Sequence, residues 1–403
     1  MLSVIVCLYN TKKEYFEECL DSIFTSTLEN FEVIVINDGS SVDYSDVIEK
    51  YNVRYIKTEN RGIMATRLYG ISVACGDYIC FGDSDDTVSF NYHAPMVEKA
   101  EKDGCDIVIN DWAFNTERCR YFCKKDTTIA KTFTVESNCL KAYCENEGGE
   151  HSYFTLWNKV FTKSLMKIVK TEIEKLPLPD MKINYGEDTL MTFFAFKNAK
   201  KVENIHTGYY FYRIQPEQTV NVIDKQKLSS QVYSMTYVLD AMDKNSDSSV
   251  AGHLKKWREL MSRTHYSYAV SKGYDDIIPY IKERYRVDKL EKSTFKDGSV
   301  YADNAVIADN FEEIDAQLKK AYSIKHSFTA NYDKRSKYVT DSINYINAHT
   351  AKTVTYSKGA AFIIPKATIK FKNKVVHNRF IYTIGMIFFK KGSKAREYLK
   401  KKI

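Results

Sequence analysis

Residues 76–86 place a short apolar segment directly before a run of acids, in the sequence Gly76-Asp77-Tyr78-Ile79-Cys80-Phe81-Gly82-Asp83-Ser84-Asp85-Asp86. Residues 78–81 have the composition of a buried β-strand, so the acids lie in the loop that follows it. Asp83 and Asp85 are one residue apart and therefore project to the same side of an extended loop. Two carboxylates in this arrangement suit Mg²⁺ or Mn²⁺, which prefer hard oxygen ligands. Acidic loops also occur without a metal, so this pattern alone leaves both interpretations open.

The same alternation of apolar segments and helical patterns extends over the first 110 residues. It predicts strands and helices in turn, with strands at 3–9, 31–36, 53–56, 78–81 and 106–109 and helices at 15–24, 62–74 and 95–101. The strands are apolar on both faces, which is typical of a parallel sheet covered by helices. The sequence therefore predicts an α/β fold whose ligands bind beyond the carboxyl ends of the strands.

Polar loops follow three of these strands, at residues 10–11, 37–41 and 82–86. Because the carboxyl ends of parallel strands meet at one edge of a sheet, we expect Asp38, Asp83 and Asp85 to gather there. Asp38 precedes Gly39 and Ser40, and an Asp in this position is also common as a turn residue or helix cap. The presence of three such loops on one edge favours a binding site.

The pattern along the chain divides it into four regions. Residues 1–110 and 111–222 form two halves of an α/β domain, residues 223–350 are mainly helical, and residues 351–403 form a basic tail. Apolar stripes at helical spacing define the helical region and are most simply the core-facing sides of helices. These stripes are Leu228, Val232, Met235 and Leu239; Leu254, Trp257, Met261 and Tyr268; and Phe311, Ile314, Leu318 and Tyr322.

The composition is that of a folded protein with one strongly basic segment. Of the 403 residues, 44% are hydrophobic and 14% aromatic, which excludes a disordered or low-complexity chain. The nine cysteines include no C-x-x-C pair, and we expect a reducing, cytoplasmic compartment. Residues 366–403 hold twelve Lys and Arg against one acid, Glu397, whereas the net charge of the whole chain is +7. The rest of the chain is thus slightly negative, which argues against nucleic-acid binding.

The basic tail also contains an apolar segment, residues 380–389, flanked by Arg379 and by Lys390-Lys391. As a helix this segment is too short to span the roughly 30 Å of hydrocarbon in a bilayer. We expect it to attach to an anionic membrane surface, with its aromatics at the headgroup boundary. A terminal helix packed on the body, with its lysines in water, is the alternative.

Several stretches of the sequence together resemble the family-2 glycosyltransferases, which are inverting, nucleotide-sugar-dependent enzymes with the GT-A fold. The resemblance covers roughly the first 220 residues, and its motifs occur in the family's order. They are residues 3–10, 33–40, 60–62 leading to Arg67, 76–86, Leu156-Trp157-Asn158-Lys159-Val160-Phe161, Gly186-Glu187-Asp188-Thr189-Leu190 and Tyr210-Phe211-Tyr212-Arg213. The last three are similar to the branch of the family that builds bacterial surface polysaccharides. The resemblance implies a GT-A sheet at residues 1–222, with the nucleotide-sugar half at 1–110 and the acceptor half at 111–222.

The resemblance also implies roles on the donor side. Tyr9 and Asp38 would flank the nucleobase, and Asn60 and Arg67 would hold the base or the diphosphate. In the D-x-D loop, which we define as residues 83–86, Asp83 would face the ribose or the metal. Ser84 would contact the nucleotide, and Asp85 would be the direct ligand of Mn²⁺ or Mg²⁺.

On the acceptor side, the resemblance places the catalytic base at Asp188 and puts Trp157, Lys159 and Glu187 near the acceptor. Glu187 and Asp188 are adjacent, so on a helix they point about 100° apart and only one can face the pocket. Both could instead be first-turn acids that interact with the helix dipole. Trp157 could equally be a core residue and Lys159 a surface lysine. Arg213 could contact the donor diphosphate or pair with a local acid.

The expected reaction transfers a sugar from a UDP-sugar to a hydroxyl group of a surface glycan, which in this branch is often lipid-linked. The expected location is the inner face of the cell membrane. A catalytically silent binding or scaffold subunit with the same fold is one alternative. A haloacid-dehalogenase-like phosphohydrolase is another, but Asp86 stands where that motif needs Gly.

Overall fold

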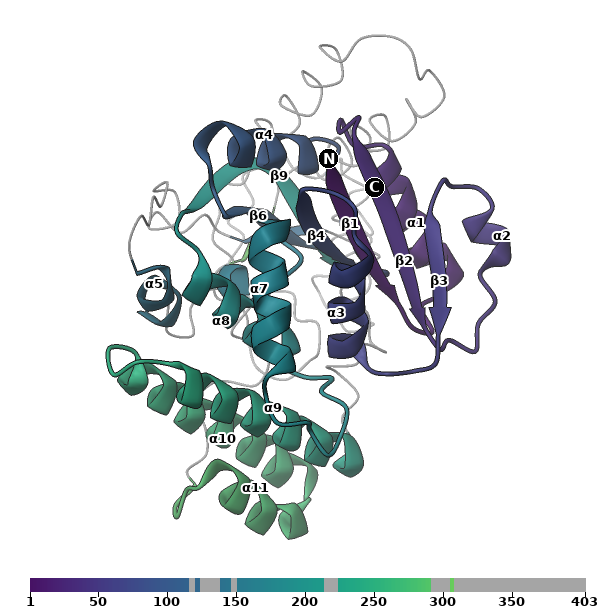
Figure 1. Cartoon of the computed structure of the whole chain (residues 1–403). Helices are drawn as coiled ribbons and strands as arrows, with labels where there is room; N and C mark the ends of the chain where they lie inside the picture. Colours follow the sequence, from purple (N-terminus) through teal and green to yellow (C-terminus); the bar gives the residue numbers. More distant parts are fainter. Residues whose placement is uncertain (116–119, 124–137, 146–150, 214–223, 291–304, 308–403) are drawn as a thin grey trace, which may run out of the picture. The chain divides into compact units, whose positions relative to one another are not determined.

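The computed structural model describes residues 1–115, 120–123, 138–145, 151–213, 224–290 and 305–307. The described residues up to Leu290 belong to one compact unit, in which helices cover both faces of a β-sheet (Figure 1). The predicted fold class is confirmed, since an α/β domain is followed along the chain by a helical region.

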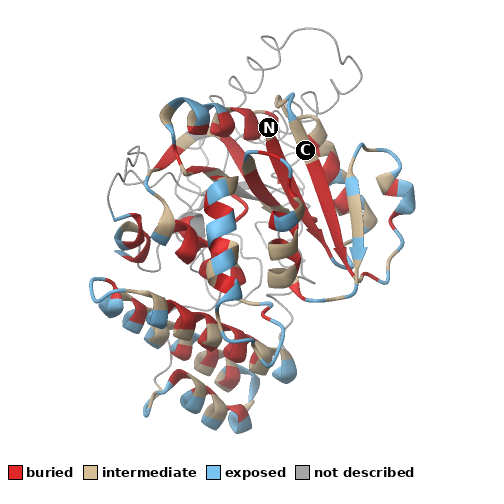
Figure 2. Ribbon diagram, in the orientation of Figure 1, coloured by how far each residue is buried: buried red, intermediate tan, exposed pale blue. Residues whose placement is uncertain are grey.

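Four parallel strands form one half of the sheet, in the order β3-β2-β1-β4. They are β1 (Leu2–Leu8), β2 (Phe31–Asp38), β3 (Arg54–Thr58) and β4 (Tyr78–Asp83). Their bounds lie within two residues of the predicted ones. β1 is buried along its whole length, as expected of a central parallel strand that is covered on both faces (Figure 2).

One antiparallel strand interrupts the predicted series of parallel strands. β8 (Lys159–Thr162) lies between β4 and β6 (Ile107–Asn115) and runs antiparallel to both. β6 therefore has the direction of β4 but is separated from it by β8, and β9 (Val202–Arg213) pairs parallel with β6. The sequence pattern predicts no strand at residues 159–162, because so short a segment cannot show a period of two.

Three further short strands are described. β5 (Thr87–Val88) pairs antiparallel with β9, and β7 (Arg120–Cys123) pairs antiparallel with β6. The last strand along the chain is β10 (Ala305–Ile307).

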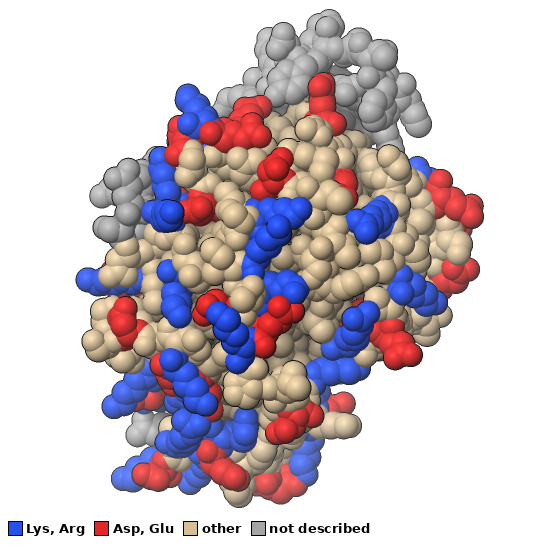
Figure 3. All heavy atoms as spheres, in the orientation of Figure 1, with Lys and Arg blue, Asp and Glu red and all other residues tan. Residues whose placement is uncertain are grey.

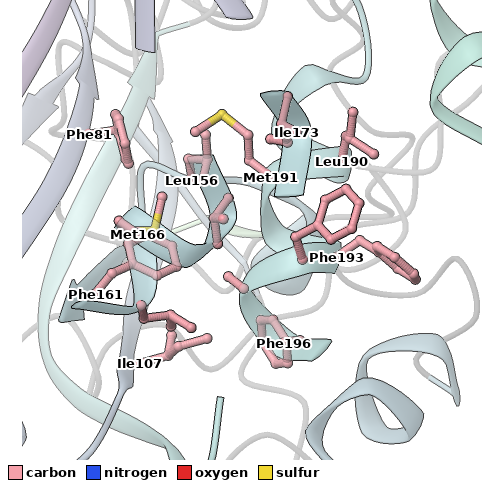
Figure 4. Close-up of a cluster of buried hydrophobic side chains, with 14 of the residues drawn as sticks. Phe81, Ile107, Leu156, Phe161, Met166, Ile173, Leu190, Met191, Phe193 and Phe196 are labelled. Carbon is pink, nitrogen blue, oxygen red and sulfur yellow. The ribbon is translucent and has the colours of Figure 1, made fainter. Parts of the chain in front are cut away.

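Alternate residues of the central strands face two separate cores. On one face, Val4 and Val6 pack with α1 (Lys13–Phe24) and α4 (His93–Asp103). On the other, Ile5 packs in a cluster with α3 (Ile63–Val73), α7 (Lys163–Glu174) and α8 (Glu187–Asn198). Figure 4 shows aromatic and aliphatic side chains of α7 and α8 meeting Phe81 and Phe161 of the sheet. Short helices complete the domain: α2 (Ser45–Ile48), α5 (Cys139–Glu145) and α6 (His151–Phe154).

The helical region consists of α9 (Lys225–Asn245), α10 (Ala251–Lys272), the 3₁₀ helix η1 (Asp275–Ile277) and α11 (Ile278–Tyr285). The first predicted stripe is buried, as Leu228 and Val232 of α9 illustrate, and the second lies on α10 with Leu254 buried. The third stripe, at 311–322, and the basic tail at 351–403 lie outside the described residues. Within the described part of the chain, every helix is too short or too polar to cross a bilayer.

Charged side chains of both signs are mixed on the face drawn in Figure 3. One such pair is on α7, where Lys170 Nζ lies 2.5 Å from Glu174 Oε1. The expectation that nucleic acid is not a partner stays a prediction.

Candidate functional site

The register of the parallel strands brings the predicted acids to one edge of the sheet. Cys7, near the end of β1, lies opposite Asp83 of β4, and Leu8 lies opposite Asn37 of β2. Asp38 and Asp83 therefore flank the end of β1 from either side. This is the carboxyl edge, where open α/β sheets bind ligands.

Asp38 holds the loop that begins α3. Its two carboxylate oxygens accept hydrogen bonds from the backbone N–H groups of Arg61 at 2.7 Å and Gly62 at 2.9 Å. These amides belong to the loop directly before α3, so Asp38 of β2 fixes the entry to that helix. Each carboxylate oxygen can accept a second hydrogen bond, so these contacts leave acceptor capacity for a nucleobase.

The expected nucleobase residues Tyr9 and Asn60 lie in the loops around Asp38. Tyr9 follows β1 and is 53% exposed, an unusual position for a large aromatic side chain. Asn60 accepts two hydrogen bonds from Lys182 Nζ, at 2.7 Å to its backbone oxygen and 2.8 Å to Oδ1. Asn184 Oδ1 accepts from the backbone N–H of Ile63 at 3.2 Å. The segment before α8 thus lies against the loop that leads into α3.

Arg67 of α3 is the buried centre of the site. Its Nη2 donates to Asp83 Oδ1 at 3.0 Å and its Nη1 donates to Glu187 Oε1 at 2.7 Å. The side chain of Arg67 is 5% exposed. These carboxylates raise the pKa of Arg67 further above its ordinary value despite the opposing effect of its burial. One guanidinium therefore joins the D-x-D loop to the first turn of α8.

The D-x-D loop is fixed by hydrogen bonds from three directions. The Oγ atoms of Ser84 and Thr11 are 2.6 Å apart. Tyr210 Oη of β9 accepts a hydrogen bond from the backbone N–H of Asp83 at 3.0 Å. Within the loop, the backbone N–H of Asp86 donates to the backbone oxygen of Asp83 at 3.1 Å.

Arg213, at the end of β9, also holds the D-x-D loop through hydrogen bonds. Its backbone N–H donates to Asp86 Oδ1 and its Nε to the backbone oxygen of Asp85, both at 2.6 Å. Its guanidinium pairs with Glu18 and lies 4.2 Å from the ring centroid of Tyr15. The sequence predicts that Arg213 either contacts the donor diphosphate or pairs with a nearby acid, and in the structure it pairs with the acid Glu18.

Glu187 and Asp188 begin α8, after Gly186 with its φ of 78°. Gly186 adopts the left-handed conformation, in which a Cβ would be strained, and that Cβ would also approach Met235 Cε to 2.9 Å. Glu187 is buried against Arg67, whereas Asp188 is half-buried and its Oδ1 accepts from the Thr189 N–H at 2.8 Å. Burial raises the pKa of both carboxyls, and the positive charge of Arg67 opposes that rise.

Trp157 and Lys159 are both interior residues. Trp157 is 6% exposed and stacks on Tyr210 with the ring centroids 4.4 Å apart. Lys159 is fully buried, and its Nζ donates to the oxygen of Thr155 at 2.5 Å and to Asn158 Oδ1 at 2.7 Å. Burial lowers the pKa of Lys159, and the negative charge of Asp188 opposes that effect. Trp157 is thus a core residue, which is one of its two predicted alternatives. The alternative that Lys159 is a surface lysine is wrong.

The donor set of the D-x-D loop fits a divalent cation that is shared with a substrate. Among the described residues, His, Cys, Asp and Glu form no cluster of three that would enclose a metal by itself. Mg²⁺ does not require such a cluster, because one or two carboxylates and substrate phosphates suffice. Asp83 is 30% exposed at its side chain and Asp85 is half-buried, so both can be reached from solvent.

Some contacts of the site have no signal in the sequence. Lys182 lies 122 residues from Asn60 along the chain, and Glu18 lies 195 residues from Arg213. Both are ordinary charged residues in ordinary polar contexts. Asp86 belongs to the quoted motif, but its role as the acceptor for the Arg213 N–H depends on how β9 passes behind the loop.

Comparisons with known proteins agree with this architecture. Residues 3–156 match the family described as "Glycosyl transferase family 2". The protein named "Putative glycosyltransferase EpsH" of Bacillus subtilis is 31% identical over 57% of this chain and 65% of its own length. Glycosyltransferase GlyA of Streptococcus pneumoniae is 26% identical over 80% of this chain and 46% of its own length. The chain thus spans less than two thirds of either relative.

Among solved structures, S. aureus TarS 1-349 in complex with UDP-GlcNAc is similar to this chain. The sequence identity is 17%, the TM-score is 0.44, and the match covers 77% of this chain and 96% of the other.

Proposed function

We propose that this chain, whose residues 3–156 match glycosyl transferase family 2, transfers a sugar from a UDP-sugar to a hydroxyl group of a bacterial surface glycan. The transfer inverts the configuration of the anomeric carbon. The proposed acceptor is a glycan, either free or linked to a lipid carrier.

The observation that carries this proposal is the double ion pair of Arg67. It joins Asp83, at the end of β4, to Glu187, at the start of α8, through contacts of 3.0 and 2.7 Å. Acids from two distant parts of the chain therefore pair with one buried guanidinium, that of Arg67, at the carboxyl edge of the sheet. A donor bound at Asp83 would therefore have its sugar directed toward the start of α8.

On the donor side, Tyr9 and Asp38 bind the nucleobase, and Asn60 holds the base or the diphosphate. The exposed ring of Tyr9 offers a face for stacking, and Asp38 offers acceptor sites for the base N–H. Ser84 contacts the nucleotide. Arg67 acts on the diphosphate side through the position of Asp83, since its guanidinium forms ion pairs with two protein carboxylates, those of Asp83 and Glu187.

Asp85, with Asp83, would hold Mn²⁺ or Mg²⁺. When bound, the cation neutralises negative charge on the leaving diphosphate. The protein prepares for this by fixing the backbone on both sides of Asp85, through Tyr210 and Arg213. The two carboxylates are thus presented from a rigid loop.

Asp188 is the general base that takes the proton of the attacking hydroxyl. Because Glu187 is held by Arg67, Asp188 is the carboxylate of the pair that remains for the acceptor. Its pKa is raised by burial, which makes it a stronger base than an exposed aspartate. Direct attack by the hydroxyl accounts for inversion without a covalent sugar–enzyme intermediate.

The acceptor half contributes Trp157, Lys159 and Glu187 as a supporting layer beneath the acceptor. Trp157 and Lys159 are buried and hydrogen-bonded or stacked inside the domain, so they shape the pocket rather than grip a sugar. The basic tail at 366–403 attaches the enzyme to the inner face of the cell membrane, next to a lipid-linked acceptor.

Donor hydrolysis in the presence of Mn²⁺ tests the proposal. UDP-glucose, UDP-galactose, UDP-N-acetylglucosamine and the GDP-sugars would be compared by release of the nucleoside diphosphate. We expect turnover of at least one UDP-sugar, and none after chelation of the metal. Metal-dependent UDP binding without any transfer or hydrolysis would instead favour a binding or scaffold subunit.

A further inference from the structure

A small pocket lies on the inner side of the D-x-D loop. Its lining includes Asp83 and Asp86 of the loop, His93 of α4 and Tyr210 of β9. The pocket has a cavity volume of about 10 Å³. A cavity of this size has room for one water molecule.

Two residues of the lining each carry one buried polar atom that has no hydrogen-bond partner among the described residues. These atoms are Oδ2 of Asp86 and Nδ1 of His93. Asp86 is 2% exposed and His93 is 3% exposed, so neither atom is solvated from outside. Buried polar groups are nearly always satisfied, and an internal water molecule is the usual partner where protein atoms are absent.

We propose that one ordered water molecule occupies this pocket, bridges Asp86 Oδ2 to His93 Nδ1, and makes His93 a positioning residue for the metal-binding loop. This inference rests on the proposed function only for the consequence of the bridge. The existence of the water site depends on the pocket and its two unsatisfied atoms alone.

The bridge completes the set of contacts that hold Asp86. Its Oδ1 already accepts from the Arg213 N–H at 2.6 Å, and its own N–H donates to the oxygen of Asp83 at 3.1 Å. With Oδ2 bound through the water to α4, Asp86 is fixed to two elements outside the loop, β9 and α4. The carboxylates of Asp83 and Asp85 are then held in one orientation. Residues that hydrogen-bond the ligands of a metal site commonly have this effect.

The chemistry of His93 suits this role. Burial lowers the pKa of His93 to about 4, so its ring is neutral at pH 7. A neutral imidazole nitrogen is either a donor or an acceptor, and water can complement both. The water forms one hydrogen bond with Asp86 Oδ2 and a second one with His93 Nδ1, and it can act as donor or acceptor in either.

A crystal structure of the wild-type protein, at a resolution that shows ordered water, tests the site directly. We expect density for one water molecule within hydrogen-bond distance of both Asp86 Oδ2 and His93 Nδ1. A dry pocket, or a water that reaches only one of the two atoms, would overturn the proposal whether or not the protein transfers sugar.

Variants of His93 test the consequence. In His93→Phe the ring remains but the polar nitrogen is lost, and we expect the affinity for UDP with Mn²⁺ to fall about tenfold, as for other outer partners of metal sites. His93→Asn keeps a polar atom near the position of Nδ1 and should retain affinity within about threefold of wild type on the same grounds. Titration calorimetry measures the affinity, and thermal unfolding shows whether each variant is folded.

His265→Phe is the matched control. His265 of α10 is also buried at 3% exposure and also has an unpartnered ring nitrogen, Nε2, but it packs in the helical region. We expect lower stability and unchanged UDP affinity. Equal affinity of wild type and a folded His93→Phe variant would contradict the positioning role. Failure of the wild type itself to bind UDP with Mn²⁺ would contradict the proposed function and leave the crystallographic test of the water site decisive.

Discussion

Arg67 and Glu187 lie 120 residues apart in the sequence, yet Nη1 of the arginine donates to Oε1 of the glutamate at 2.7 Å inside the protein. The second branch of the same guanidinium holds Asp83. A lysine could not reproduce this contact, because its single ammonium lacks the planar fork of an arginine. The geometry of the donor half and of α8 is therefore coupled through one side chain.

Replacing Arg67 with methionine should destabilise the protein strongly. The change leaves the carboxylates of Asp83 and Glu187 without their cation, and breaking a buried ion pair from one side costs about 3–5 kcal/mol. Chemical denaturation would measure the loss. Arg67→Lys should fall between wild type and Arg67→Met. Lys50→Ala removes an exposed pair with Glu17 and should barely move the midpoint. A small effect of Arg67→Met would contradict the central role given to this residue.

Asp188→Asn should slow transfer strongly while leaving donor binding intact. The amide keeps the shape of the side chain but cannot accept the proton of the acceptor, so kcat should fall by about 10²–10⁴-fold. Steady-state transfer and calorimetry with UDP would separate the two effects. Asp275→Asn changes an exposed acid of η1 and serves as the control. Normal turnover of the Asp188→Asn variant would remove this residue from the reaction.

Removal of the divalent cation should stop turnover and weaken UDP binding. Treatment with EDTA followed by gel filtration, and then addition of Mn²⁺ or Mg²⁺, would show whether activity returns. Asp85→Asn should raise the Mn²⁺ concentration needed for half-maximal activity, because a carboxylate binds a hard cation better than an amide does. Full activity in EDTA would show that the D-x-D loop works without metal.

Acid should destabilise the protein partly through His265, whose pKa is lowered to about 4 by burial. Above pH 6.5, the ordinary pKa of histidine, the ring is neutral in both states and costs nothing. As the pH falls toward 4, the unfolded chain takes up a proton that the folded protein does not bind, so stability is lost. Between pH 7.5 and 5 the loss is about 2 kcal/mol.

His265→Gln cannot titrate and isolates this contribution. The variant should lose the hydrogen bond to Tyr285, which is 2.7 Å from His265 Nδ1, and so be less stable at pH 7.5. Its urea midpoint should nevertheless fall less between pH 7.5 and 5 than that of wild type. Parallel pH dependence in the two proteins would show that His265 is not the titrating group.

The basic tail should bind anionic membranes. Flotation with liposomes that contain phosphatidylglycerol would compare the full chain with a chain that ends at Pro365. We expect only the full chain to float, and to do so less at high salt, because Lys and Arg near an anionic surface contribute about 1 kcal/mol each and are screened by ions. Equal flotation of both proteins would discard the attachment.

The amino-acid sequence alone is enough to predict the strands of the parallel half of the sheet and the acids at their ends. Residues 78–81 were apolar enough to predict β4, and the positions of Asp38 and Asp83 at strand ends placed them on one edge without any tertiary information. Strand period and chain order suffice for such a prediction, because parallel strands joined by helices all end on the same side.

Which of these residues contact one another depends on how the elements pack. The insertion of β8 between β4 and β6, the pairing of Arg67 with Glu187, and the burial of Lys159 depend on packing between segments far apart in the chain. Local propensity carries no information about such contacts, since the same residues in isolation would be exposed and solvated. Their partners are selected when the two cores close on the sheet and each buried charge must find a counter-charge or a hydrogen bond.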